Sequence, residues 1–97
     1  MRIQISKRAQ AQLHQIYIYY KDSGKGMAGR RIRAAILKKI MRLKIFPEMG
    51  QEEELLKEKN KGFRYLVEGK YKIVYRVKED TVRIELIFDT RQDPSKM

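Results

Sequence analysis

The stretch FRYLVEGKYKIVYRVKEDTVRIELIFD, from Phe63 to Asp89, decides the fold because it predicts three consecutive strands. β-Branched and aromatic residues dominate the stretch, and two short polar breaks divide it. The strands are expected at residues 63–67, 70–77 and 81–89, with breaks at Glu68-Gly69 and at residues 78–80. Connections this short join antiparallel neighbours, so the stretch predicts an antiparallel meander.

The last of these strands is expected to bury both faces at its end. Because side chains alternate along a strand, one face is predicted to carry four apolar residues, namely Val82, Ile84, Leu86 and Phe88. Ile87 falls on the opposite face, which indicates that the strand end is covered on both sides.

The residues before the meander predict one strand and two helices. Residues 2–6 alternate like a strand, and Ser6 suits the N-cap of a helix that begins at Lys7. Its apolar stripe is expected to consist of Ala9, Leu13, Ile16, Tyr17 and Tyr20. A turn at residues 22–26 leads to a second helix from about Met27 to Ile45, with the stripe Ile32, Ile36, Ile40 and Leu43. Helices joined by so short a turn pack as an antiparallel hairpin.

Residues 46–50 break the second helix, and residues 51–62 are expected to form a loop with about one helical turn. The element order is therefore β-α-α-β-β-β. This order predicts an α+β fold in which a helical hairpin packs on a small, mainly antiparallel sheet. We expect a single domain over residues 1–97.

The charge of the chain is positive and unevenly distributed. Its 23 Lys and Arg against 12 Asp and Glu give a net charge of +11. Residues 1–46 hold 12 of the basic residues and one acidic residue, which by itself gives +11. Three of these cations, Arg31, Lys38 and Arg42, are expected opposite the apolar stripe of the second helix and are candidates for binding the target or a phosphate. A field of this sign favours a polyanion or an acidic protein as partner, although a solvated basic face is the simpler interpretation.

Composition excludes some kinds of site. The chain has no cysteine, so it has no disulfide, thiolate nucleophile or cysteine-based metal site, which is compatible with the cytoplasm. Its start does not resemble a signal peptide. The longest apolar run, Ile16–Tyr20, is too short to span a bilayer, and no membrane partner is expected.

Four stretches in the same order resemble the RelE/ParE superfamily of type II toxin–antitoxin toxins. They are A-x-x-x-L-x-x-I-Y-x-x-Y at residues 9–20, L-x-x-F-P-E-M-G at residues 43–50, the central FRYLVEGKYKIVYRV block at residues 63–77 and IFDTRQDP at residues 87–94. The resemblance spans nearly the whole chain. It implies a cytoplasmic toxin that a cognate antitoxin holds inactive. Members of the superfamily are either ribosome-dependent mRNA endonucleases or poisons of DNA gyrase.

The resemblance also implies the candidate site residues. Arg64 matches the family's arginine before the central hairpin, and Arg91 matches the arginine after the last strand. Both guanidinium groups suit phosphate, and Arg76 joins them as a candidate for binding the target or a phosphate. Nuclease members often carry histidine where Asp89 stands, and an aspartate with an ordinary pKa near 4 is a weak base at neutral pH. No tyrosine follows Tyr75, whereas other nuclease members have one in the tail.

Other residues with catalytic or ligand chemistry favour plain structural roles. His14 lies beside the apolar stripe of the first helix and is expected at the surface. The run Glu52-Glu53-Glu54 carries three carboxylates, but consecutive residues on a loop do not hold them in the fixed geometry that a metal site needs. A solvated loop is expected there. Six tyrosines are suited to stacking on bases, namely Tyr17, Tyr19, Tyr20, Tyr65, Tyr71 and Tyr75. Most are expected to serve packing, because Tyr17 and Tyr20 belong to the apolar stripe and Tyr71 and Tyr75 alternate along a strand. Neither a metal nor a cofactor is expected.

The preferred hypothesis is a ParE-like toxin that acts by binding, with DNA gyrase as its target. The first alternative is a ribosome-dependent mRNA endonuclease that uses Arg64 and Arg91, with Asp89 as a third catalytic residue. The second alternative is an inactive homologue that serves as a binding module. Given the charge of +11, the antitoxin is expected to carry an acidic tail. The sequence identifies neither the antitoxin nor the oligomeric state.

Overall fold

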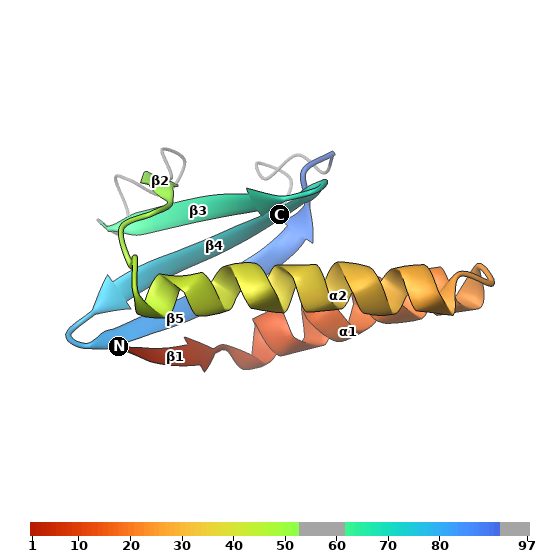
Figure 1. Ribbon diagram of the computed structural model, residues 1–97, viewed down its shortest axis with the longest axis horizontal. Coiled ribbons are helices and arrows are strands. Elements are labelled where there is room, and N and C mark those ends of the chain that lie inside the picture. The colour runs from red at the N-terminus through yellow and green to blue at the C-terminus, as the bar shows by residue number, and fades with distance from the viewer. Residues whose placement is uncertain (53–61, 92–97) are drawn as a thin grey trace.

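The computed structural model describes residues 1–52 and 62–91, which fold into a sheet with two α-helices on one face (Figure 1). The elements in chain order are β1 Arg2–Ile5, α1 Lys7–Asp22, α2 Gly26–Met41, the 3₁₀ helix η1 Arg42–Lys44, β2 Gln51–Glu52, β3 Phe63–Glu68, β4 Tyr71–Lys78 and β5 Thr81–Asp89. The predicted α+β fold and its helical hairpin are confirmed. No helix in the described ranges is both long and apolar enough to span a membrane.

The sheet has the order β1-β5-β4-β3-β2, so the first strand lies beside the last. β1 runs parallel to β5, and the other neighbours are antiparallel, as the meander predicted. β2 was not predicted, because the sequence indicated a loop from Gln51 onward. The rest of that loop, residues 53–61, lies outside the described residues, as do residues 92–97.

The predicted face pattern of β5 was wrong, because a β-bulge interrupts the strand. β4 and β5 pair Val74 with Leu86 but Tyr75 with Ile84, so Glu85 is an extra residue without a partner on β4. The bulge shifts the alternation by one. Ile87 therefore joins Val82 and Ile84 in the core under the helices, while Phe88 is buried on the other face. The expectation that both faces are covered at this end holds.

The two helices pack as the antiparallel hairpin that the sequence predicted (Figure 1). α1 starts at its predicted cap, where the Ser6 hydroxyl accepts a hydrogen bond from the Ala9 N–H at 3.0 Å. α2 ends at Met41, four residues before the predicted end at Ile45, and η1 continues the chain to Lys44. The core combines both helix stripes with the sheet, namely Ala9, Leu13, Ile16, Ile36, Ile40, Leu43, Leu66, Tyr71, Ile73, Tyr75, Val82, Ile84 and Ile87.

Candidate functional site

The predicted arginines do not converge on one site. Arg64 pairs with Tyr75 across β3 and β4, whereas Asp89 pairs with Tyr71 across β4 and β5. Tyr75, beside Arg64, and Tyr71, beside Asp89, are four residues apart on β4, which corresponds to about 13 Å along the strand. Arg91 lies still further along, beyond the end of β5. Arg64 and Arg91 are thus too far apart to contact the same phosphate group in this conformation.

Arg64 has a structural role in holding the loop after η1. Its Nη1 donates to the Gly50 carbonyl at 2.8 Å. The fully buried Tyr75 hydroxyl donates to the Pro47 carbonyl and accepts from the Gly50 N–H, both at 2.8 Å. Gly50 fits because a Cβ there would lie 2.7 Å from the Tyr75 hydroxyl. Together these groups fix residues 47–50 against the sheet.

Arg76 lies on the sheet face that the helices leave open, in an ion-pair network with Glu85. Its guanidinium carbon is 5.4 Å from the centre of the Phe63 ring, and its Nε is 3.4 Å from Glu85 Oε2. That Nε is buried and makes no hydrogen bond to any described residue. Arg83 Nε donates to the other Glu85 oxygen at 2.7 Å. Glu85 is thus neutralised by two arginines, and Arg76 is held in place.

Asp89 and Arg91 form a tight pair at the end of β5. Arg91 Nε donates to both Asp89 oxygens at 3.0 and 3.1 Å, and Arg91 Nη2 donates to Asp89 Oδ2 at 2.6 Å. The Arg91 backbone N–H adds a fourth hydrogen bond at 2.8 Å. These bonds from Arg91 lower the pKa of Asp89 from 3.8 to about 2. The shift runs opposite to what a general base would need, and it leaves Asp89 ionised at neutral pH.

The pair orients an otherwise exposed arginine. The Arg91 side chain is 69% exposed, against 17% for Asp89. A guanidinium has five N–H groups, and the side-chain bonds to Asp89 use the Nε–H and one Nη2–H. Arg91 therefore directs its remaining donors outward from a fixed position. Asp89 is accordingly a positioning residue for Arg91.

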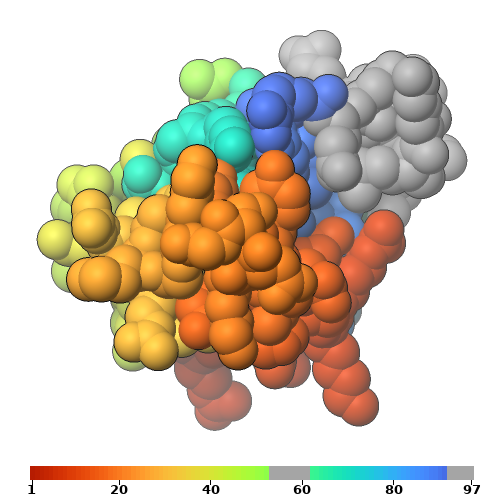
Figure 2. All heavy atoms as spheres, turned by 90° about the vertical axis from the view of Figure 1, so that its right-hand side faces the viewer, coloured from red at the N-terminus to blue at the C-terminus, as the bar shows by residue number. Residues whose placement is uncertain are grey.

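Three tyrosines and a lysine lie beside this pair. With the pair they form what we call the hairpin end: Tyr19, Tyr20, Lys70, Tyr71, Asp89 and Arg91. In Figure 2 the tip of the helical hairpin, the turn between β3 and β4 and the end of β5 gather on one face. The Tyr71 hydroxyl donates to the Tyr20 hydroxyl at 3.4 Å. Lys70 Nζ lies 5.5 Å from the centre of the Tyr20 ring.

The tyrosine pair has opposite pKa shifts. The pKa of Tyr20 is lowered, chiefly by the hydrogen bond from Tyr71 and next by that from Lys70. Burial and the bond to Tyr20 raise the pKa of Tyr71. Two clefts flank the pair, one of about 380 Å³ towards Arg91 and one of about 330 Å³ towards Arg31. The hairpin end therefore combines cations, phenol groups and open space.

The remaining candidate residues do not belong to the hairpin end. Arg31, Lys38 and Arg42 are exposed along α2 and η1, and only Arg31 reaches one of the two clefts. His14 is exposed, as predicted, with its ring 6.5 Å from the Tyr17 ring. Glu53 and Glu54 fall outside the described residues, within which no acidic or histidine cluster suits a metal ion.

The contribution of Lys70, Tyr20 and Tyr71 was not predicted from the sequence. Tyr20 and Tyr71 are 51 residues apart in the chain and meet only because α1 packs on β5, the neighbour of β4. The one local signal was Lys70, which follows the Glu68-Gly69 turn and so had to lie at the sheet end that also holds Asp89.

Comparisons with known proteins give one family and one fold. The sequence model of a family described as the ParE toxin of type II toxin-antitoxin system, parDE, matches residues 3–94. A chain in a solved structure described as "Chromosomal ParDE TA system from P. aeruginosa" superposes with a TM-score of 0.76 at 20% sequence identity. The superposition covers 92% of this chain and 95% of that chain, and it shows a shared fold. No curated protein sequence matched.

Proposed function

The chain belongs to the ParE toxin family of type II toxin–antitoxin systems, and from this premise we propose that it inhibits DNA gyrase by binding rather than by catalysis. The observation that carries the proposal is the Asp89–Arg91 pair. It presents an oriented, exposed cation, and the carboxylate that holds this cation stands where the resemblance places the histidine of nuclease members. The family match confirms the superfamily expected from the sequence, whereas the target is our inference.

The described residues do not support acid–base cleavage of RNA. A general base works best when its pKa lies near the operating pH, and the pKa of Asp89 is about 2. Arg64 donates to the Gly50 carbonyl, and it lies about 13 Å along the sheet from the level of Asp89. A 2′-hydroxyl attack would need a base and cationic groups around one phosphate, and these residues do not surround one.

The hairpin end instead has the composition of a protein-binding surface. Arginine and tyrosine are the residue types enriched in binding hot spots. Tyr19 is 62% exposed and stands edge-on to Tyr20, with 5.2 Å between the ring centres. Because Asp89 already fixes Arg91, a partner need not order that side chain on binding, which lowers the entropic cost of association.

The proposal includes a cognate antitoxin with an acidic segment. Residues 1–46 carry a net charge of +11, equal to that of the whole chain, and eight of their 12 cations lie on α1 and α2. An acidic segment would be steered to this surface and would neutralise it. On this proposal the toxin acts in the cytoplasm, where its target is found.

The first experiment asks whether the purified chain traps gyrase–DNA cleavage complexes in the absence of ribosomes. We expect linear and nicked DNA to accumulate with the wild-type chain. Arg91→Ala should lose most of this effect, because the variant removes the oriented donors. Arg42→Ala is the matched control, since it deletes an exposed arginine of η1 outside the hairpin end. A wild-type chain that traps no complex at saturation contradicts gyrase as the target.

A parallel reaction with ribosomes and a defined mRNA tests the alternative chemistry. We expect no cleavage above background. If the wild-type chain cleaves the mRNA and the double variant Arg64→Ala, Arg91→Ala does not, then the endonuclease is the correct function. The double variant must keep its circular dichroism spectrum for this comparison, because Arg64 also holds residues 47–50.

A further inference from the structure

The outer edge of the sheet at β1 is open to an additional strand. β1 is the last strand on its side of the sheet, and among the described residues no strand pairs with its outer edge. Such an edge presents backbone donors and acceptors that a second chain can pair with. Proteins usually cover or disrupt an edge of this kind. The open edge of β1 therefore indicates that another chain binds there.

The hydrogen bonds of β1 show which groups face outward. The N–H groups of Arg2 and Ser6 donate to the Asp80 and Ile84 carbonyls, both at 2.9 Å, and therefore point towards β5. Because a strand alternates, the N–H and C=O groups of Ile3 and Ile5 point away from β5. The Ile5 carbonyl accepts from Gln10 Nε2 at 2.9 Å. That bond is exposed, so an added strand can replace it.

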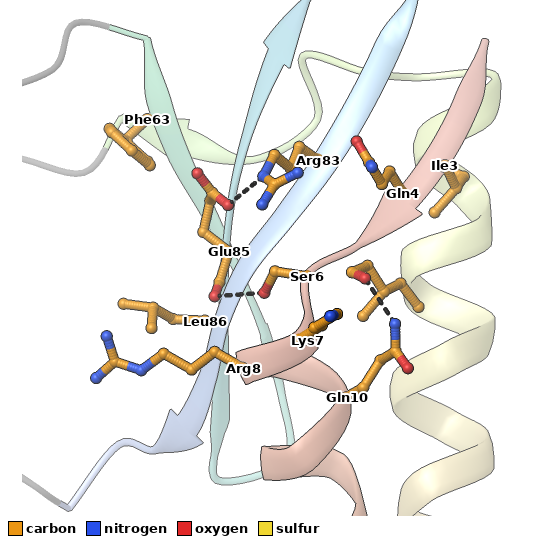
Figure 3. Close-up of a pocket in the computed structure, with 11 residues that line it drawn as sticks. Ile3, Gln4, Ser6, Lys7, Arg8, Gln10, Phe63, Arg83, Glu85 and Leu86 are labelled. Atoms are coloured by element: carbon orange, nitrogen blue, oxygen red, sulfur yellow. Dashed lines mark hydrogen bonds and ion pairs between the residues drawn. The ribbon is translucent and has the colours of Figure 1, made fainter.

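A large cavity opens directly beside this edge. Its volume is about 980 Å³, and its walls come from β1, the start of α1, β5 and Phe63 of β3. Figure 3 shows Gln4 and Arg83 on one side of the cavity and Arg8 with Leu86 on another. Side chains of a strand added to β1 that point to the open face of the sheet would enter this cavity.

The cavity favours negative charge. Its titratable lining residues are Lys7, Arg8, Arg83 and Glu85. Glu85 is the one acid among them, and it already bonds Arg83 at 2.7 Å and lies 3.4 Å from Arg76. Lys7 and Arg8 therefore remain as exposed cations at the rim, next to the open edge. Apolar walls from Ile3, Leu86 and Phe63 provide contact area between the charges.

We propose that the outer edge of β1 and the cavity beside it bind an extended acidic peptide, which joins the sheet as an additional strand. Backbone hydrogen bonds to Ile3 and Ile5 would provide affinity, and carboxylates pointing into the cavity would provide specificity for acidic sequences. This surface is separate from the hairpin end. The acidic antitoxin segment of the proposed function is the natural peptide of this kind, so the identity of the ligand rests on that proposal.

A second copy of the chain fits this edge poorly. Two copies would bring two molecules of charge +11 together, with Lys7 and Arg8 of each facing those of the other. Like charges placed opposite one another across an interface oppose pairing. An acidic peptide replaces this repulsion with attraction.

Binding of a defined peptide to the full chain tests the inference. The probe is a fluorescein-labelled peptide of eight residues that alternates glutamate and valine, and its binding is measured by fluorescence anisotropy. Arg8→Glu should weaken binding about tenfold, whereas Lys38→Glu, which makes the same charge change on the exposed face of α2, should weaken it much less. Arg8→Glu should fold normally, because glutamate suits the first turn of a helix. Equal losses in the two variants would show plain charge attraction and overturn the inference.

The backbone part of the inference has its own test. Two further peptides carry N-methyl groups on either the odd-numbered or the even-numbered residues, which removes the donors along one edge of the strand or the other. One version should bind and the other should not, because a strand added in one direction presents only every second amide to β1. Binding should also slow hydrogen exchange of the Ile3 and Ile5 amides. If both versions bind alike, or these amides are not protected, no strand is added. Neither readout involves gyrase, so the result is independent of the target assay.

Discussion

At the scale of single residues, the bond between Asp89 and Arg91 determines the ionisation of the candidate site. We expect Arg91→Ala to raise the pKa of Asp89 from about 2 towards 3.8, because the largest cause of the lowered value is the hydrogen bond from Arg91. Carboxyl carbon shifts of Asp89 followed by NMR between pH 1.5 and pH 6 measure this directly. Arg42→Ala should leave the pKa unchanged. An unchanged value in Arg91→Ala would mean that another group holds Asp89 ionised.

The same pair contributes to stability in a defined pH range. The folded-state pKa of Asp89 lies below its ordinary value, so the pair stabilises the fold fully above about pH 4. This contribution is lost as the pH falls towards 2. Its size is modest, because Arg91 is well exposed and water screens the interaction. The pair therefore serves to orient Arg91 more than to stabilise the fold.

Gly50 is a second residue whose identity is required by its surroundings. A Cβ at this position would lie 2.7 Å from the Tyr65 carbonyl and from the Tyr75 hydroxyl. Gly50→Ala must displace Tyr75 or the backbone, and we expect the free energy of unfolding to fall by about 1–3 kcal/mol. Urea unfolding followed by circular dichroism measures the change.

The matched control for this variant is Gly26→Ala. A Cβ on Gly26 meets nothing within 4 Å, so the effect should stay within about 0.5 kcal/mol. If Gly50→Ala is as mild as Gly26→Ala, then residues 47–50 can move away from Tyr75, and the role assigned to Arg64 in holding them is wrong.

At the scale of elements, Ser6 joins the start of α1 to β5. Its hydroxyl accepts from the Ala9 N–H and donates to the Glu85 carbonyl, each at 3.0 Å. Ser6→Ala leaves both backbone groups without these partners, and we expect a loss of about 1–2 kcal/mol in the free energy of unfolding. Ser23→Ala is the control, because that hydroxyl bonds the Tyr19 carbonyl at an exposed site. Equal losses would show that Ser6 is no more than an ordinary cap.

The Ser6 bond to Glu85 also shows why sequence patterns predicted the elements better than their details. Local periodicity determined the two helices and the three-strand meander, because each apolar stripe lies within one element. The bulge at Glu85 depends on pairing with β4 and on the bond from Ser6, 79 residues away. No local pattern encodes such contacts, and the face of Ile87 was therefore predicted wrongly. β2 likewise exists only through its pairing with Tyr65 and Arg64.

The sequence predicted part of the candidate site, as it did for the fold. The sequence indicated Asp89 and Arg91 as site residues, because they lie two positions apart at the end of a predicted strand. The sequence also grouped Arg64 with Arg91, but four residues along β4 separate Arg64 from the level of Asp89, and Arg91 lies beyond it. Conversely, it did not group Tyr20 with Tyr71, which meet through helix packing. Chemistry inferred from residue types alone therefore overestimated how many arginines act together.

At the scale of the whole molecule, the two proposed surfaces lie at different places. The hairpin end joins the last turn of α1 to the β3–β4 turn and the end of β5, whereas β1 lies at the other end of α1 (Figure 1). A peptide on β1 would leave Arg91 accessible unless the partner extends along α1. An antitoxin long enough to neutralise the toxin would therefore have to reach from one surface to the other.

Production of the chain without an antitoxin should show which cellular process it stops first. If the chain binds gyrase, DNA synthesis should fall before protein synthesis, because trapped cleavage complexes block replication directly. Labelled thymidine and labelled methionine added to one culture after brief induction measure both rates.

Arg91→Ala, produced in soluble form at the same level, should restore growth, since it removes the oriented cation but not the fold. Earlier loss of methionine incorporation would instead assign the target to mRNA or the ribosome. If neither rate fell, the chain would be a binding module that keeps the β1 edge for its acidic peptide without inhibiting a target.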